Sequence, residues 1–293
     1  MNPNLKDLEN DFLYHLGYSR SDDLVTLFGD VKFVVTGGSG GRMRKVAEAL
    51  AEEFHLTEEE KKRIDISRTD RFSFYKVGPV LSVSHGMGVP SISILLHEII
   101  KLLKYANTVD PIIIRIGTCG GVGIEPGTVV ISNKVYNAYL KSEHVTVILG
   151  KSVVRPVELD QGTAKEIFQC GVDSGFKPLL GGTMCTDDFY EGQARMDGCI
   201  CEFSQQEQMD YIKKLQQMGI VNIEMECTVL ASLCQKTGVK GAIICVSLLD
   251  RMKGDQVAIS TETYKNYQER PRALLIKYLR KKLQEIQHPF GSR

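Results

Sequence analysis

The chain has 293 residues, of which 43% are hydrophobic and 25% are charged, and this composition predicts a large folded core rather than disorder. Lysine plus arginine and aspartate plus glutamate both number 36, so the formal net charge is zero. No basic excess therefore points to nucleic acid or an anionic membrane as a partner, although a few cations aimed at one point could still hold a small anion.

Strand-like and helix-like segments alternate along the chain. Residues 31–35 form a short apolar run closed by glycines, which predicts a buried strand, and the apolar spacing over 42–54 predicts the helix that follows. By the same criteria we expect further strands at 77–84, 111–116, 128–132, 179–184, 220–223 and 241–249. We expect further helices at 89–105, 163–172, 205–218, 225–235 and 262–286. Residues 134–156 have weaker periodicity, and we assign no element there.

This alternation predicts an α/β fold in which helices cover both faces of a mostly parallel sheet. No linker rich in proline or serine, no repeat and no low-complexity tract divides the chain. We therefore expect one domain over residues 1–293, with residues 1–10 and 287–293 flexible.

The eight cysteines form no Cys-x-x-Cys pair and no zinc-finger spacing, and most of them lie in an apolar context. We interpret them as buried, reduced thiols of an intracellular protein, and we expect no metal site. Residues 1–11 are polar and acidic without an apolar signal core, and no apolar run approaches the ~20 residues that span a bilayer. We therefore expect a soluble, cytoplasmic protein.

The most informative segment is Arg-Ile-Gly-Thr-Cys-Gly-Gly at 115–121, which closes the apolar strand at 111–116. The guanidinium of Arg115, the hydroxyl of Thr118 and backbone N–H groups freed by the glycines are the parts of an oxyanion pocket. An arginine that ends an isoleucine-rich strand is unfavourable unless it is paired. A bound anion such as phosphate would pair it, and a structural partner such as Glu125 is the alternative.

A second glycine-rich segment, Gly-Gly-Ser-Gly-Gly-Arg at 37–42, follows the first strand and opens a helix. Glycines there let the chain turn tightly toward an anion, and a helix N-terminus favours negative charge. The segment matches neither a P-loop nor the dinucleotide-binding glycine pattern, so an ordinary glycine turn is the alternative. Gly38 and Arg42 lie just past a strand end, where ligands gather in open α/β sheets.

Two further segments carry groups that suit a nucleoside. If the chain is extended over 189–195, Gln193 and Arg195 point the same way and match the oxo–NH–oxo edge of a pyrimidine-dione, with Phe189 stacked on the ring. A solvated polar loop is the alternative. In Ile-Glu-Met-Glu at 223–226, a carboxylate could accept hydrogen bonds from a ribose diol, or could simply complement a helix N-terminus.

Taken together, these segments resemble the nucleoside phosphorylase family, and within it the uridine phosphorylases found in animals. The resemblance runs from about Tyr14 to the C-terminal helix. Four more segments fit it: Phe-Gly-Asp-Val at 28–31, Tyr-Lys-Val-Gly-Pro-Val at 75–80, Ser-His-Gly-Met-Gly at 84–88 and Thr-Met-Cys-Thr at 183–186. The resemblance implies a three-layer α-β-α sandwich with a mixed, mostly parallel central sheet. It also implies reversible phosphorolysis of uridine to uracil and ribose 1-phosphate in pyrimidine salvage, with inorganic phosphate as a substrate and no cofactor.

The resemblance implies a phosphate site formed by Gly38, Arg42, Arg115 and Thr118. Arg71 matches an arginine that reaches the phosphate bound by the neighbouring subunit. The resemblance therefore implies a homodimer in which each active site takes residues from both subunits.

The resemblance places uracil against Phe189, Gln193 and Arg195. Arg251 matches a residue near the uracil 4-oxo group that acts through water, and Val257 matches an apolar residue that lines the base pocket. For the ribose, the matching residues are Met225, Glu226 and, from the partner subunit, His15. The side chains expected to carry the catalysis are Arg115, Gln193, Arg195 and Glu226.

One position departs from the family pattern. Uridine phosphorylases usually have Asn-Arg near the end of the last core strand, whereas this chain has Asp250 followed by Arg251. Purine-cleaving relatives carry an aspartate at about this place, so a purine nucleoside phosphorylase is one alternative, although Gln193 and Arg195 suit a pyrimidine. A catalytically silent nucleoside-binding paralogue and a hydrolytic nucleosidase are the others.

Overall fold

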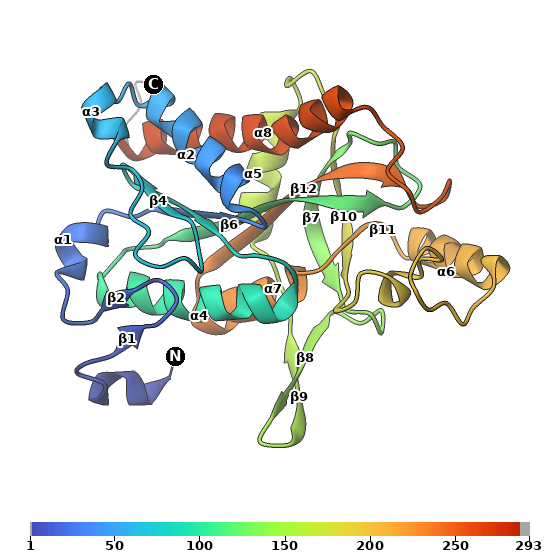
Figure 1. Cartoon of the computed structure of the whole chain (residues 1–293), viewed down its shortest axis with the longest axis horizontal. Helices are drawn as coiled ribbons and strands as arrows, with labels where there is room; N and C mark the ends of the chain where they lie inside the picture. Colours follow the sequence, from blue (N-terminus) through green and yellow to red (C-terminus); the bar gives the residue numbers. More distant parts are fainter. Residues whose placement is uncertain (1, 288–293) are drawn as a thin grey trace.

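The computed structural model describes residues 2–287, and its centre is an eight-stranded sheet in the order β11-β10-β7-β12-β6-β3-β5-β4 (Figure 1). The strands are β3 (Phe33–Gly37), β4 (Phe74–Val77), β5 (Val80–Ser84), β6 (Ile112–Gly121), β7 (Val129–Tyr136), β10 (Pro178–Cys185), β11 (Ile220–Glu224) and β12 (Lys240–Asp250). Most neighbours run parallel, whereas β4–β5, β7–β12 and a short contact between β11 and β6 are antiparallel. The sheet is mixed and mostly parallel, which confirms the predicted α/β class.

Helices cover both faces of this sheet (Figure 1). One face carries α2 (Gly40–Glu53), α5 (Gln161–Gly171) and α8 (Thr261–Gln287), and the other carries α4 (Gly88–Tyr105) and α7 (Cys227–Thr237). The three-layer sandwich is therefore confirmed. No helix within residues 2–287 combines the length and the apolar character needed to cross a bilayer.

The strands have this sequence because both faces of the sheet are buried. In β3, Val34 packs into the core under α4 and α7, while its neighbours Phe33 and Val35 pack under α2 and α8. Successive strand side chains point to opposite faces, so a strand covered on both sides needs an uninterrupted apolar run. That requirement explains why the short apolar runs in the sequence predicted the central strands.

Two predicted strands differ from the structure. Residues 77–84 were expected to form one strand, but β4 and β5 are two antiparallel strands joined by a turn at residues 78–79. The strand expected at 111–116 continues as β6 to Gly121, because its second half pairs with β12. Arg115 therefore lies within a strand and not at its end.

A β-hairpin occupies part of the segment that had no assignment. β8 (Glu143–Ile148) and β9 (Lys151–Pro156) pair antiparallel and project from the body of the molecule (Figure 1). Val147, Leu149 and Val154 are exposed. Because most of the hairpin is not covered by this chain, its residues need not alternate between apolar and polar, which accounts for the weak periodicity.

The remaining elements are η1 (Pro3–Asp7), β1 (Phe12–Leu13), β2 (Tyr18–Ser19), α1 (Leu24–Phe28), α3 (Glu58–Lys61), η2 (Glu191–Gln193) and α6 (Gln205–Gln217). The guanidinium of Arg20 donates to the carbonyls of Leu5 (2.9 Å) and Leu8 (2.7 Å) and so ties η1 to the body. Flexibility of residues 1–10 stays a prediction, and residues 288–293 lie outside the described part of the chain.

Candidate active site

A cavity of about 460 Å³ lies beyond the carboxyl ends of β3, β5 and β11 and along the second half of β6. Ten of the thirteen predicted site residues line it: Gly38, Arg42, Arg115, Thr118, Phe189, Gln193, Arg195, Met225, Glu226 and Val257. A larger hollow of about 690 Å³ lies beside the N-terminal segment, but none of the predicted residues lines it. We therefore place the candidate site in the smaller cavity.

The loop between β3 and α2 brings Gly38 and Arg42 to the cavity. The hydroxyl of Ser39 caps α2 by accepting the backbone N–H of Arg42 at 3.3 Å. A Cβ on Gly38 would lie 3.1 Å from the carbonyl oxygen of Gly86, which is tighter than an ordinary contact, so glycine favours the close approach of this loop to the β5–α4 loop. Within residues 2–287 Arg42 makes no ion pair, and burial together with the charge of Arg115 lowers the pKa of its guanidinium. A bound anion would offset both effects.

Arg115 is buried within β6 and pairs with two carboxylates. Its Nη2 donates to Glu226, and its Nη1 lies 3.1 Å from Oε2 of Glu224. Burial alone would lower the pKa of Arg115, but Glu226 and Glu224 raise it well above its ordinary value. The alternative partner Glu125 was wrong, because that side chain is exposed and pairs with Lys253 at 3.1 Å.

The glycines after Arg115 do not act as expected. We predicted that they free backbone N–H groups to face an anion, but residues 117–121 belong to β6 and pair with β12. Gly117 instead leaves room for the arginine, because a Cβ there would lie 2.8 Å from Nη1 of Arg115. Thr118 still lines the cavity beside Arg115.

Glu224 ends β11 and Glu226 follows two residues later, and the two carboxylates have different contacts. From the sequence, a ribose contact and the helix N-terminus were alternatives for one carboxylate. The carboxylate of Glu224 accepts the backbone N–H groups of Glu226 (3.0 Å) and Cys227 (2.8 Å), so it is Glu224 that complements the N-terminus of α7. Glu226 accepts the N–H of Gly88 at the start of α4 (2.7 Å) and the ion pair with Arg115. Burial raises the pKa of Glu224. Burial also acts to raise the pKa of Glu226, but the charge of Arg115 together with His85 and the N–H of Gly88 outweighs it, and the pKa is lowered.

Phe189, Gln193 and Arg195 form the loop part of the cavity, but not through an extended chain. The segment forms the 3₁₀ helix η2, and the residue after Gln193 is left-handed, with φ 53°. Both Gln193 and Arg195 nevertheless line the cavity and are buried. The guanidinium of Arg195 lies 4.5 Å over the ring of Phe189 and forms two hydrogen bonds with Asp197 (2.9 and 2.8 Å).

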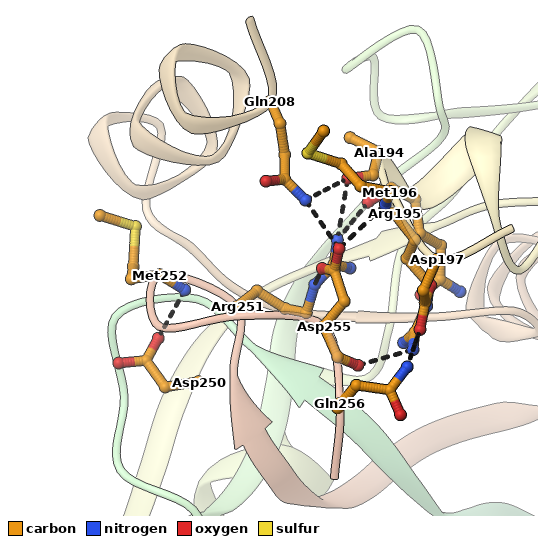
Figure 2. A network of polar contacts seen from close by, with 11 residues as sticks. Ala194, Arg195, Met196, Asp197, Gln208, Asp250, Arg251, Met252, Asp255 and Gln256 are labelled. Carbon is orange, nitrogen blue, oxygen red and sulfur yellow. Dashed lines mark hydrogen bonds and ion pairs between the residues drawn. The ribbon is translucent and has the colours of Figure 1, made fainter. Parts of the chain in front are cut away.

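Asp255 joins three segments behind this loop (Figure 2). Its Oδ1 accepts from Nε of Arg251, and its Oδ2 accepts from the backbone N–H of Met196 and from Nε2 of Gln208, each at 2.9 Å. Its backbone carbonyl accepts from Nη2 of Arg195 at 2.6 Å. A single carboxylate therefore ties the loop after β12 to the 189–197 loop and to α6.

Arg251 does not line the cavity. Its side chain is fully buried, and its Nη2 donates to the carbonyls of Gln193 (2.8 Å) and Ala194 (3.1 Å). Its Nη1 has no hydrogen-bond partner within the described residues. The structure therefore places Arg251 behind the 189–197 loop, where it supports the backbone of Gln193.

Asp250, the departure from the family pattern, also lies outside the cavity lining. Its Oδ1 accepts the backbone N–H groups of Gly123 and Met252, both at 3.0 Å, and its Oδ2 lies 3.6 Å from Nζ of Lys253. These contacts hold two turns together.

His15 and Arg71 also lie outside this chain's own cavity. Nδ1 of His15 is 2.6 Å from Oε1 of Glu98, while the side chain of Arg71 is 69% exposed. The hydroxyl of Thr69 donates to the carbonyl of His15 at 2.5 Å, so the two predicted partner-reaching residues belong to one surface region.

Some lining residues were not predicted. They include His85 and Met87 after β5, Cys119 in β6, Glu224 in β11 and Leu248 and Leu249 in β12. His85 and Met87 belong to the Ser-His-Gly-Met-Gly segment, which follows a strand in the same way as the glycine-rich segment at 37–42, and this position is the signal that could have found them. Glu224 could have been found because it is two residues before Glu226 in the same Ile-Glu-Met-Glu segment.

Two of the cysteines belong to a group that could offer ligand atoms to a metal ion. Within the described residues one group has suitable ligand atoms, with those of Cys185, Glu224 and Cys227 within 4.8 Å of one another. Glu224 is already engaged by Arg115 and two backbone N–H groups, and burial raises the pKa of the Cys227 thiol, which disfavours the thiolate that a metal requires. The expectation that the cysteines are buried was wrong for Cys199 and Cys201, which are exposed.

Comparison with known proteins shows to which protein family the chain belongs. The model of the phosphorylase superfamily matches residues 32–280. Uridine phosphorylase 2 of Mus musculus is 46% identical over 285 residues, which cover 96% of this chain and 89% of that protein. Uridine and thymidine phosphorylase of Caenorhabditis elegans is 45% identical over 94% of this chain and 92% of that protein.

A solved structure agrees with these relatives. Uridine phosphorylase from Schistosoma mansoni in complex with uracil superposes with a TM-score of 0.90 at 38% identity, covering 96% of this chain and 98% of that one. The chain therefore belongs to the phosphorylase superfamily and, within it, to the uridine phosphorylase family.

Proposed function

We propose that this protein catalyses the reversible phosphorolysis of uridine to uracil and ribose 1-phosphate. The observation that carries the proposal is the set of side chains that line one cavity of about 460 Å³. The guanidinium groups of Arg42 and Arg115 share it with Gln193 and Arg195, and within residues 2–287 Arg42 makes no ion pair. An oxyanion and a pyrimidine-dione can therefore be held side by side.

The phosphate is the nucleophile. Gly38, Arg42, Arg115 and Thr118 hold it and aim one of its oxygens at the anomeric carbon of the nucleoside, an effect of position more than of pKa. That oxygen bonds to the anomeric carbon as the glycosidic bond breaks through an oxocarbenium-like state. The electron pair of the glycosidic bond leaves with the uracil, whose ring nitrogen then takes up the proton that the hydrogen phosphate releases as it becomes the ester.

Hydrogen-bond donors then stabilise the departing base. Within the described residues the amide of Gln193 makes no side-chain hydrogen bond, so its donor and acceptor are free for a uracil edge. Arg195 is fixed by Asp197, so its guanidinium is already oriented before the base binds. Each donor of this kind is worth roughly 2.7–4 kcal/mol if it acts like an oxyanion-hole donor.

Glu226 and Asp250 have different roles in this proposal. Glu226 is held by Gly88 and Arg115, and its ionised oxygens can accept hydrogen bonds from the ribose hydroxyls beside Met225. Asp250 is engaged by two backbone N–H groups outside the cavity lining, so it is not placed to protonate a purine nitrogen. This arrangement favours a pyrimidine substrate.

We also propose a cytoplasmic homodimer of single-domain subunits that needs no metal or organic cofactor. His15 and Arg71 support the dimer, because they lie together on the surface and outside their own cavity. In the dimer, His15 and Arg71 of one subunit would complete the ribose and phosphate sites of the other.

The test is an assay of uridine, thymidine, inosine and adenosine, each with and without inorganic phosphate. We expect uracil to be released from uridine only when phosphate is present, with inosine and adenosine uncleaved. Free ribose in the absence of phosphate would indicate a nucleosidase. Stabilisation by uridine without any turnover would indicate a silent binding protein.

A further inference from the structure

His85 is a buried polar side chain of the cavity that the proposed mechanism does not use. It follows β5, lines the cavity and is 0% exposed. Its backbone is fixed on both sides, because its N–H donates to the carbonyl of Gly37 (2.9 Å) and its carbonyl accepts the hydroxyl of Ser91 (2.5 Å). Within the described residues neither ring nitrogen has a hydrogen-bond partner.

Such an unpaired ring is unusual, because buried polar side chains nearly always have a partner. His144 shows the ordinary arrangement in the same chain. It is also buried, but its Nδ1 lies 3.3 Å from the hydroxyl of Thr228. No described group of the protein therefore compensates the buried ring nitrogens of His85, which points to a ligand as their partner.

The surroundings of the ring indicate which ligand. Its Cε1 lies 3.9 Å from the point where a Cβ on Gly38 would be, so the ring is packed against the β3–α2 loop. Arg42, Arg115 and Glu226 line the same cavity. Three of these four neighbours are the residues to which we assign the phosphate.

We propose that His85 is a further phosphate-binding residue whose imidazole hydrogen-bonds an oxygen of the bound phosphate. The inference rests on the proposed function, because it assumes that phosphate occupies this part of the cavity. Burial and the charge of Arg115 lower the pKa of His85 to about 3, so the ring is neutral at physiological pH. A neutral ring has one N–H donor and one bare nitrogen, and it binds the anion without adding a third positive charge beside the two arginines.

The experiment compares His85→Leu, His85→Gln and the wild-type protein. We expect His85→Leu to raise the KM for inorganic phosphate about tenfold or more, since a hydrogen bond to a charged group is lost, while the KM for uridine changes little. Its Tm at neutral pH should be equal to or higher than that of the wild type, because no hydrogen bond between described residues is removed. His85→Gln keeps a donor and an acceptor and should restore part of the phosphate affinity.

His144→Leu is the matched control. It removes a buried imidazole that has a protein partner, so we expect a lower Tm and an unchanged KM for phosphate. If His85→Leu behaves like this control, His85 is a structural residue and the proposal is wrong. If His85→Leu does not fold, His85→Phe replaces it, because phenylalanine keeps a planar ring. The same two quantities, the KM for phosphate and the Tm, are then compared with those of the wild type.

Direct calorimetric titration with inorganic phosphate separates this proposal from the proposed function. If the wild-type protein binds phosphate but does not cleave uridine, the proposed function fails, while a loss of binding in His85→Leu still supports the role of His85. Equal phosphate affinity in the wild type and His85→Leu would overturn the inference whatever the activity.

Discussion

The two sides of the cavity are built differently. The side to which we assign the phosphate consists of the ends of β3, β5 and β11, the starts of the helices that follow them, and the middle of β6, where Arg115 is held by Glu224 and Glu226. The side to which we assign the base consists of the 189–197 loop and the loop after β12, which are held together by Asp255 and Arg251 (Figure 2). Changes to Arg115 or its two carboxylates should therefore affect stability and phosphate binding together, whereas changes to His85 should affect phosphate binding without lowering stability. Changes on the second side should affect base binding alone.

The largest effect is expected for Arg115→Ala. Removing the guanidinium leaves Glu224 and Glu226 buried without their counter-ion, which should lower the free energy of unfolding by about 3–5 kcal/mol. Turnover should fall strongly and the KM for phosphate should rise, as measured by steady-state kinetics and urea unfolding. Lys253→Ala is the control, because its pair with Glu125 is exposed and should be worth about 0–1 kcal/mol. Unchanged phosphate kinetics in Arg115→Ala would remove the phosphate assignment.

Gln193→Leu should act on the base side only. We expect kcat/KM for uridine to fall about 100- to 1000-fold, through the loss of a donor to the uracil oxygens, with Tm almost unchanged. The control is Gln217→Leu, an exposed glutamine on α6 that should keep full activity. Full uridine cleavage by Gln193→Leu would show that the base binds elsewhere.

Lowering the pH should reduce the free energy of unfolding, because His85 is protonated in the unfolded chain before it is protonated in the folded protein. The unfolded histidine has a pKa of about 6.5 and the folded one about 3, so the unfolded chain binds the extra proton between these values and stability is lost as the pH falls. The slope is about 1.4 kcal/mol per pH unit, so this residue alone should lower the free energy of unfolding by roughly 2–3 kcal/mol between about pH 6 and about pH 4. Urea unfolding of the wild type and of His85→Leu at both pH values measures the difference. Equal pH dependence in the two proteins would contradict the low pKa.

The smallest effect is expected for Asp255→Asn. An amide nitrogen in place of Oδ2 is a donor and can accept from neither Met196 nor Gln208, so the 189–197 loop should loosen and the KM for uridine should rise about tenfold. The KM for phosphate should not change. The control is Asp173→Asn, which changes an exposed aspartate in the same way and should leave the KM for uridine and the KM for phosphate unchanged. A rise in the KM for phosphate alone would break the proposed division of the cavity.

Much of the fold could be predicted because the sheet is buried on both faces. An uninterrupted apolar run as short as the one at β3 is typical of a strand that is covered on both sides. Two of the errors fell where burial does not control the sequence. The turn at residues 78–79 divides a run that is apolar on both sides, and the exposed hairpin of β8 and β9 needs no pattern.

Most residues that line the candidate cavity were predictable as a set of side chains, but their contacts with one another were not. Arg115, Gln193 and Glu226 are recognisable by their chemistry and by the resemblance to the family. The pairing of Arg115 with Glu226 joins residues 111 positions apart, which no local spacing reveals. His85 lies in a segment that fits the family, but only the structure shows that its ring is buried and, within the described residues, unpaired.

The central claim is that one cavity holds phosphate and uracil at the same time. A crystal structure of the protein grown with both would test it most directly. We predict phosphate among Gly38, Arg42, Arg115 and Thr118, and uracil against Phe189 within reach of Gln193. A structure in which this cavity stays empty, or in which either ligand binds in the hollow beside the N-terminal segment, would contradict the account.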